Sequence, residues 1–257
     1  EMKWLVENEV ITYLREKYNL TQMIHYRVLK VADIGESAVD ERIGHLIADS
    51  KNPTVGVLAH PGQVDVRIAA LSENIDAANA LIDTVDVEVR KLLGDNIFAV
   101  DDATIESVVG ELLVTKNATV ATCEDLSGGS IASAVQKAAD SAFLQSSIVN
   151  SNEALEKIAQ SGGETPPFAD GAERAAALAR SIRKTTGATY GIAVHGTEEG
   201  DKRTENLGKG ETYIVVSGPD GERTRHVRSA GRGEPDRQRA AMGALSLFRR
   251  ELLGLPE

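Results

Sequence analysis

The spacing of apolar residues divides the chain into a leading helix and two folded regions. Apolar side chains recur at helical intervals near the start, where residues 1–18 are expected to form a helix: Val6, Val10, Tyr13 and Leu14. A strand, a helix, two strands and a helix are then predicted, at residues 22–32, 39–49, 54–59, 64–69 and 78–94. This order favours a small α+β domain over residues 21–100. Residues 1–20 are interpreted as a residual helix from a missing upstream domain. Because the sequence begins with Glu1 rather than Met, we expect a fragment or a processed product.

Helices and strands alternate from residue 101 onward. An amphipathic helix is predicted over residues 105–113, and a buried strand over 119–123 leads through a glycine pair into a helix ending at Ala138. Further strands are expected at 147–150, 190–194, 212–217 and 223–228, and further helices at 153–159, 172–182 and 236–253. Such alternation is typical of a three-layer α/β domain, here spanning residues 101–257.

Composition narrows the classes of function. The net charge of −11 and an aromatic content of only 4% argue against binding to nucleic acid, whose backbone is anionic and whose bases stack on aromatic rings. No run of 18 apolar residues and no signal-peptide pattern occurs, so the cytoplasm is the expected location. The single cysteine, Cys123, cannot form an internal disulfide, and the histidines lack metal-ligand spacing. We therefore expect neither a metal nor a cofactor.

The segment from Thr119 to Ala132 carries the strongest candidate site. A strand runs into a short polar loop and a helix, which places Glu124, Asp125 and Ser127 at the carboxyl end of the strand, where open α/β sheets bind ligands. Glycines let the backbone approach a ligand, and the helix N-terminus is expected to offer free N–H groups to an anion. Alternatively, the turn is structural and its polar side chains only cap the helix.

Short motifs spread along the chain point to one family. They are Glu1-Met2-Lys3 followed by Glu9-Val10, the segment Ile34–Ser37, the Pro61-Gly62 hairpin and the segment Gly94–Phe98. With these motifs in order, the whole chain resembles the CinA (competence/damage-inducible protein) family without its first domain. The resemblance implies a KH-like domain at residues 21–100 and, at 101–257, a domain similar to nicotinamide-nucleotide amidohydrolase (nicotinamide mononucleotide deamidase). The KH-like region has no Gly-x-x-Gly loop and carries twelve acids against seven bases, so RNA binding is not expected.

The active-site motifs of that family are altered in this chain. Its Glu-Ser-Cys-Thr-Gly-Gly motif corresponds to residues 124–129, with Asp125 at the nucleophilic serine. Its Tyr-Ser-Asn-Glu-Ala-Lys motif corresponds to residues 150–155, with Leu155 at the activating lysine, and His195 stands at a threonine of the third motif. A serine–lysine mechanism needs a hydroxyl that a neutral amine deprotonates, so we expect this mechanism to be lost. Because we expect the loop at a sheet edge, a lysine at position 155 should cost little stability.

Residues that match the family are expected to bind the ligand: Glu124, Gly128, Gly129, Ser151, Asn152 and Arg237. Arg237 lies in the stretch 222–250, which has eight arginines against three carboxylates. The planar fork of arginine suits phosphate, so a phosphate is expected near Ser127, Gly129 and Arg237. Alternatively, this stretch is a solvated helix face.

The catalytic candidates are Asp125, Ser127 and His195. His195 follows an apolar strand, and with Asp125 it would form a carboxylate–imidazole pair that resembles half of a hydrolase site. Alternatively, His195 is structural. Cys123, within the buried strand, is expected to be a small core residue.

Three functions stay open at this stage. The resemblance implies an active amidohydrolase with a rebuilt site, a degenerate relative that binds a nucleotide or phosphate ligand or supports assembly, or a fragment of a metal-dependent pyrophosphatase whose active domain lies upstream. We favour the degenerate relative. We expect a small-molecule partner and a homo-oligomer, and no nucleic-acid or membrane partner.

Overall fold

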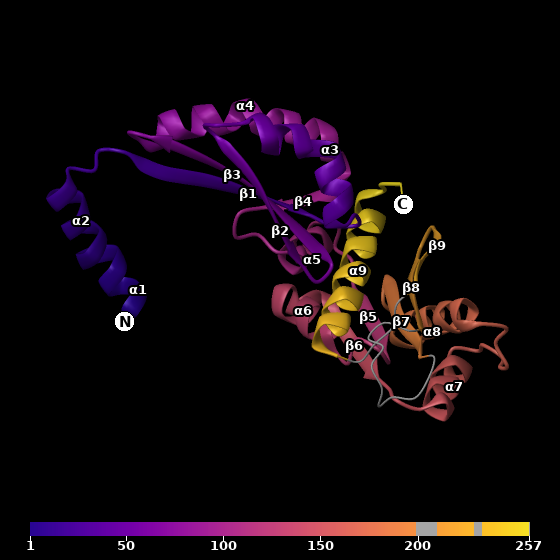
Figure 1. Ribbon diagram of the computed structural model, residues 1–257. Coiled ribbons are helices and arrows are strands. Elements are labelled where there is room, and N and C mark those ends of the chain that lie inside the picture. Colours follow the sequence, from indigo (N-terminus) through magenta and orange to yellow (C-terminus); the bar gives the residue numbers. More distant parts are fainter. Residues whose placement is uncertain (199–209, 229–232, 257) are drawn as a thin grey trace. The chain divides into compact units, whose positions relative to one another are not determined.

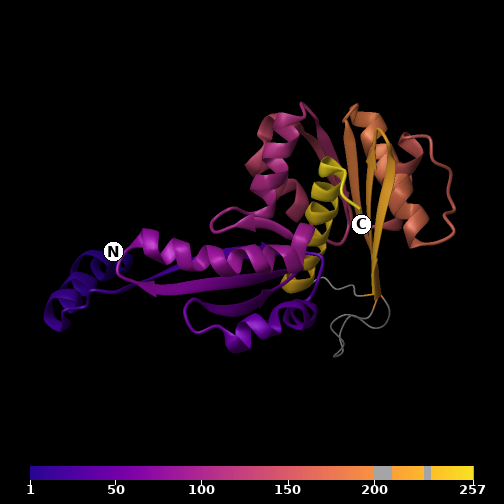
Figure 2. The same cartoon turned by 90° about the horizontal axis from the view of Figure 1, so that it is seen from above.

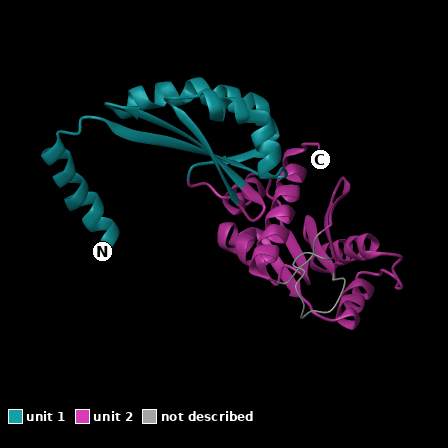
Figure 3. Cartoon of the chain, in the orientation of Figure 1, with its two compact units in different colours: residues 1–59, 64–101 teal, residues 60–63, 102–257 magenta. Residues whose placement is uncertain are grey.

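The chain is described from a computed structural model that covers residues 1–198, 210–228 and 233–256. It divides into two compact units, residues 1–59 with 64–101 and residues 60–63 with 102–257 (Figure 3). Each unit is built around its own β-sheet.

The first unit is a four-stranded sheet in the order β2-β3-β1-β4, with helices α3 and α4 on one face (Figure 1). Strand β1 runs antiparallel to both β3 and β4. Its elements are α1 (Met2–Leu5), the π-helix η1 (Val6–Val10), α2 (Ile11–Tyr18), β1 (Met23–Val31), α3 (Glu36–Asp49), β2 (Thr54–His60), β3 (Gln63–Ser72), α4 (Ile75–Leu93), η2 (Gly94–Asn96) and β4 (Ile97–Val100). The predicted order of strand, helix, strand, strand, helix is confirmed, and β4 is an additional strand that the apolar pattern did not reveal.

The core of the first unit follows from period-two alternation in β3. Val64, Val66 and Ile68 are fully or almost fully buried, while the intervening Asp65 and Arg67 lie toward solvent. The buried set packs with apolar residues of α3 and α4, including Ile43 and Ile82. The leading helix is different, because none of its residues is buried.

The second unit is a five-stranded sheet in the order β6-β5-β7-β8-β9. Strands β6, β5 and β7 run parallel, whereas β8 runs antiparallel to β7 and β9. Its elements are α5 (Ile105–Thr115), β5 (Val120–Glu124), α6 (Ser130–Ala138), η3 (Asp140–Ala142), β6 (Phe143–Ile148), α7 (Asn152–Ser161), α8 (Gly171–Thr186), β7 (Tyr190–Glu198), β8 (Gly210–Gly218), β9 (Gly221–Val227) and α9 (Glu234–Leu253).

Helices cover both faces of this second sheet. Helices α5, α6 and α9 lie on one face and α7 and α8 on the other (Figures 1 and 2). The predicted three-layer α/β fold is therefore confirmed. Strand β6 lies at 143–148, earlier than the predicted 147–150. Because β5, β6 and β7 are parallel, their carboxyl ends share one edge of the sheet, which we call the carboxyl edge, and their starts share the amino edge.

Candidate functional site at the carboxyl edge of the second sheet

Consecutive residues at the end of β5 serve opposite faces of the sheet. Cys123 belongs to the apolar cluster that β5 and β7 form with α7 and α8, including Ala121 and Ala193. Glu124 is oriented the other way, toward α6, as period-two alternation requires. Asp125, the next residue, returns to the face of Cys123, where it meets His195. Three neighbouring polar or reactive side chains thus enter three different environments.

Glu124 is a fully buried carboxylate that accepts five hydrogen bonds. Its Oε2 accepts from the Ser127 hydroxyl at 2.7 Å and from the N–H groups of Gly129 at 3.0 Å and Ile131 at 3.2 Å. Its Oε1 accepts from the Ala132 N–H at 2.8 Å and from the Thr122 hydroxyl at 3.1 Å. These backbone donors belong to the start of α6, so the carboxylate caps this helix and complements its dipole.

The expectation that the start of α6 offers free N–H groups to a phosphate is therefore wrong. The Glu124 carboxylate already occupies the place where an anion would bind, and it satisfies the donors of Gly129, Ile131 and Ala132. A second anion there would meet a like charge and no spare amide. Glu124 and Gly129 consequently build the loop, and no surface of Glu124 is open to a ligand.

Ser127 is committed to the same network. Its side chain has no exposed surface, and its hydroxyl donates to Glu124. A nucleophile has to reach both a base and a substrate, and the hydrogen bond to a capping carboxylate provides neither. In this arrangement Ser127 braces the turn that leads into α6, which is the structural alternative considered for this turn.

Asp125 and His195 form a buried carboxylate–imidazole pair. Oδ2 of Asp125 lies 2.5 Å from Nδ1 of His195, and Oδ1 accepts from the Gly196 N–H at 3.0 Å. The side chains are only 5% and 6% exposed. The parallel register pairs Glu124 with Val194. The residues that follow them, Asp125 and His195, therefore lie side by side. The juxtaposition considered from the sequence is thus present in the structure.

This pair has the geometry of an oriented general base. A carboxylate oxygen accepts hydrogen bonds, so the contact assigns the donated proton to Nδ1 and leaves Nε2 for another partner. The second hydrogen bond, from Gly196, fixes the carboxylate. Such a unit can take a proton from water or a hydroxyl that reaches Nε2.

Leu155 is a core residue, which corrects the expectation of a tolerant edge position. It is 4% exposed and belongs to the same apolar cluster as Cys123. An ammonium group in this apolar cluster would lose its hydration and gain no carboxylate or other hydrogen-bond acceptor in return. Position 155 therefore supplies packing where the family motif implies a lysine, and a lysine there should be costly.

Ser151 and Asn152 lie at the carboxyl edge and serve α7. The Ser151 hydroxyl caps this helix by accepting from the Ala154 N–H at 3.2 Å. Oδ1 of Asn152 accepts from Nη1 of Arg174 at 2.9 Å, which ties the start of α7 to α8. Both residues are exposed, so contact with a ligand stays a prediction for them.

Arg237 reaches the glycine pair from the start of α9. A Cβ atom built on Gly128 would lie 3.2 Å from Nη1 of Arg237 and 3.5 Å from its Cζ, so the guanidinium packs against the bare backbone of this glycine. Gly128 also has a φ of +63°, a left-handed conformation that favours glycine. The expected proximity of Arg237 to the loop is thus observed, although α6 contributes no free amide.

The structure adds Tyr213 to the surroundings of His195. The two residues are directly opposite each other in the β7–β8 register, which brings their Cβ atoms to within about 5.5 Å. The Tyr213 ring stacks on His226 with centroids 4.7 Å apart, and its hydroxyl donates to Glu211. This hydrogen bond and burial raise the pKa of Tyr213 to about 12. Sequence reasoning missed Tyr213 because only the strand register reveals it.

Other expectations can be compared with the structure directly. Cys123 is 1% exposed, and burial raises the pKa of its thiol to about 12, as fits a core residue. Within residues 1–198, 210–228 and 233–256, no group of three or more His, Cys, Asp or Glu side chains is placed to hold a metal ion. None of the helices in these ranges is long and apolar enough to cross a membrane.

Comparison with known proteins identifies the family. The model of the damage-inducible protein CinA KH domain matches residues 26–99, and that of the CinA C-terminal domain matches residues 102–252. The second match alone spans more than half of the sequence, so the chain belongs to the CinA family. The resemblance noted in the sequence is confirmed at this level.

Two curated relatives, from Frankia casuarinae and Clostridium novyi, support the same conclusion. The chain is 34% identical to a CinA-like protein of Frankia casuarinae, covering 100% of this chain and 60% of that protein. It is 31% identical to a competence-damage inducible protein of Clostridium novyi, covering 98% of this chain and 62% of that protein. The crystal structure of competence damage-inducible protein A from Klebsiella pneumoniae has 22% identity and a TM-score of 0.49, over 58% of this chain and 95% of that one. The chain spans less than two thirds of the length of the Frankia casuarinae and Clostridium novyi proteins.

Proposed function

We propose that the second unit binds a phosphate-bearing pyridine nucleotide at the carboxyl edge of its sheet and does not deamidate it by a serine–lysine mechanism. The contact of Arg237 with Gly128 carries the proposal, because it brings a guanidinium onto an open stretch of backbone at the edge where α/β sheets bind ligands. A guanidinium has five N–H donors, so a phosphate can join whatever partner Arg237 already has.

The residues that would perform family chemistry are assigned to other tasks. Asp125 orients His195, Ser127 donates to the buried Glu124, and Leu155 fills the core. None of these three offers an activated hydroxyl. Phosphate recognition through arginine does not depend on them, so binding can persist where catalysis is lost.

Binding is tested with nicotinamide mononucleotide and the variant Arg237→Ala. At 100 times its dissociation constant, the nucleotide should stabilise the protein by about 2.7 kcal/mol. Arg237→Ala should weaken binding at least about tenfold, since each charge-assisted hydrogen bond contributes roughly 1.5–3 kcal/mol. Arg239→Ala is the matched control, because Arg239 is half-exposed and pairs with Asp236 at 3.0 Å. Equal effects of the two variants would show that Arg237 does not contact the nucleotide.

A second candidate rests on the 2.5 Å contact between Asp125 and His195. The oriented imidazole would activate a water molecule for attack on an amide, which is a rebuilt hydrolase site. Ammonia release at about 1 per second, within the usual range of enzymes, would favour this candidate. His195→Gln should then abolish ammonia release, and release that persists in this variant would exclude the candidate.

The partner, oligomeric state and cellular location of the protein are also proposals. We propose a small-molecule partner, a homo-oligomeric state and a cytoplasmic location, and no partnership with nucleic acid or membranes. The strongly acidic composition, with a net charge of −11, supports the last point. The activity of a longer protein that includes this chain is a separate matter.

A further inference from the structure

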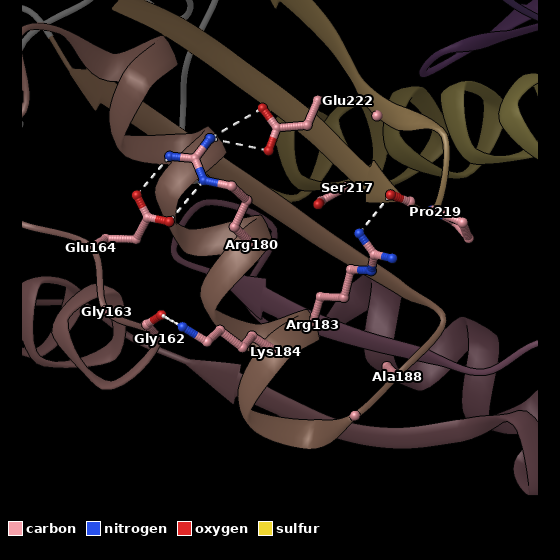
Figure 4. A pocket seen from close by; sticks show the side chains of 13 residues that line it. Gly162, Gly163, Glu164, Arg180, Arg183, Lys184, Ala188, Ser217, Pro219 and Glu222 are labelled. Carbon is pink, nitrogen blue, oxygen red and sulfur yellow. Dashed lines mark hydrogen bonds and ion pairs between the residues drawn. The ribbon is translucent and has the colours of Figure 1, made fainter.

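A cavity lies at the amino edge of the same sheet, away from His195. It measures about 740 Å³ and is lined by the last turns of α8, the loop after α7 and the β8–β9 turn (Figure 4). Strand β7 rises about 3.3 Å per residue, which places His195 roughly 17 Å beyond Tyr190 at the amino edge. The volume falls in the range of about 300–1,000 Å³ that is usual for small-molecule sites.

Two walls of this cavity are fixed by Arg180. Its guanidinium donates to Glu164 at 2.7 and 2.8 Å and to both carboxylate oxygens of Glu222 at 3.1 Å. The hydrogen bond from Arg180 lowers the pKa of the Glu164 carboxyl. The loop after α7 and strand β9 are therefore joined through one side chain, and the three charges hold a preformed opening between them.

Two further cations, Arg183 and Lys184, face the cavity, and among the described residues their hydrogen bonds go to backbone carbonyls, although the charge of Lys184 also helps to lower the pKa of Glu164. Nη1 of Arg183 donates to the Gly218 carbonyl at 2.5 Å, and Nζ of Lys184 donates to the Gly162 carbonyl at 2.8 Å. Figure 4 shows Arg183 extending toward the β8–β9 turn and Lys184 toward the loop after α7. These bonds orient both groups, and each group has further N–H donors, since guanidinium carries five and ammonium three.

The lining carries a local excess of positive charge. Arg180, Arg183 and Lys184 stand against Glu164 and Glu222, in a chain whose net charge is −11. The spacing of three and four residues places these cations on one face of α8, near its C-terminus, where the helix dipole favours cations. Glycines at the rim leave the backbone open, and a Cβ built on Gly187 or Gly221 would meet nothing within 4 Å.

We propose that this amino-edge cavity binds a phosphate-bearing small molecule, whose anionic group is attracted by the positive charges of Arg183 and Lys184 on two walls of the cavity. Arginine offers a planar fork and lysine a point charge, and both suit a phosphate oxyanion. The cavity is larger than a bare phosphate, so the rest of the ligand lies along the glycine rim. This site is separate from the Arg237 site and does not depend on it.

The test is calorimetric titration of the full chain with inorganic phosphate and with ribose 5-phosphate. The double variant Arg183→Gln/Lys184→Gln should weaken phosphate-dependent binding at least about tenfold, in line with the usual strength of charge-assisted hydrogen bonds. Lys116→Gln/Lys137→Gln removes the same charge from exposed positions outside the cavity and should leave binding unchanged. Repeating the titrations in an Arg237→Ala background isolates this site from the carboxyl edge.

Each outcome bears on the proposal. Tighter binding of ribose 5-phosphate than of inorganic phosphate supports an organic phosphate ester as the ligand, and equal or weaker binding overturns that assignment. Absence of saturable binding in the Arg237→Ala background, or equal weakening by both double variants, overturns the proposal. If the cavity variant melts at a lower temperature, Lys184→Gln alone replaces it, because Lys184 is exposed and its ammonium group donates to the Gly162 carbonyl at 2.8 Å, a bond that the glutamine amide can also make. Unchanged affinity in a folded Lys184→Gln protein also overturns the proposal.

Discussion

Replacing Glu124 with glutamine should destabilise the second unit, because the carboxylate accepts five hydrogen bonds in full burial. A glutamine amide keeps one accepting oxygen and puts an NH₂ group in place of the other. If the NH₂ group replaces Oε1, it faces the Ala132 N–H, donor against donor. If it replaces Oε2, it faces the N–H groups of Gly129 and Ile131. At least one buried backbone donor is left unpaired in either orientation.

The magnitude follows from these lost bonds. An unpaired buried donor costs about 1–3 kcal/mol, and loss of the charge weakens the bonds that remain, so we expect about 2–4 kcal/mol in all. For a unit of this size, that corresponds to a fall of roughly 4–16 °C in melting temperature. Glu111→Gln is the matched control, because Glu111 is exposed on α5 and should change stability by no more than about 0.5 kcal/mol.

Differential scanning calorimetry combined with amide hydrogen exchange is the appropriate assay. The exchange of residues 129–132 should accelerate in Glu124→Gln more than that of residues elsewhere in the second sheet, because their donors lose the cap. If Glu124→Gln melts within 1 °C of the unmodified protein and residues 129–132 stay protected, then Glu124 does not cap α6 and the start of this helix is open to an anion after all.

Three further predictions follow from other parts of the second unit. Leu155→Lys should destabilise it by several kcal/mol, whereas the volume-conserving Leu155→Met should cost less than about 1.5 kcal/mol; equal urea midpoints for the two variants would contradict the burial of position 155. Cys123, with a pKa raised to about 12 by burial, should resist iodoacetamide at pH 8 in the folded protein and react on unfolding; rapid labelling of the native protein would refute its burial. Because the folded pKa of this thiol lies above its unfolded value, its contribution to stability is retained below about pH 9 and lost progressively as the pH rises toward 12, so calorimetry should show a steeper loss of stability over that range than in Cys123→Ala.

The sequence was sufficient for most of the fold, because long amphipathic patterns leave few alternatives. The alternation of Val64, Val66 and Ile68 located β3, and the apolar stripe from Ala78 to Leu92 located α4. The sequence-based prediction failed for strands whose apolar pattern is too short to recognise. Strand β4 has only four residues, and β6 begins with the half-buried Phe143 and carries polar residues along its length, so neither shows a regular period.

The candidate site was predicted less completely, because function there depends on directions that sequence does not encode. The sequence offered the meeting of Asp125 with His195 only as a hypothesis, because it does not show that their strands are neighbours, and the parallel register of β5 and β7 brings them together. Glu124 and Asp125 lie on opposite faces of the sheet, and the sequence does not show which face each one takes. Because Glu124 lies on the face of α6, its carboxylate caps that helix. Tyr213 could be placed beside His195 only through the antiparallel register.

Calorimetric titration of the protein with nicotinamide mononucleotide tests the central claim most directly, because one trace reports both binding and turnover. We expect a saturable heat that returns to the baseline after each injection, and we expect Arg237→Ala to reduce the affinity at least about tenfold. A sustained heat of turnover near about 1 per second would contradict the loss of catalysis, and a trace without binding heat at millimolar nucleotide would contradict the ligand site itself.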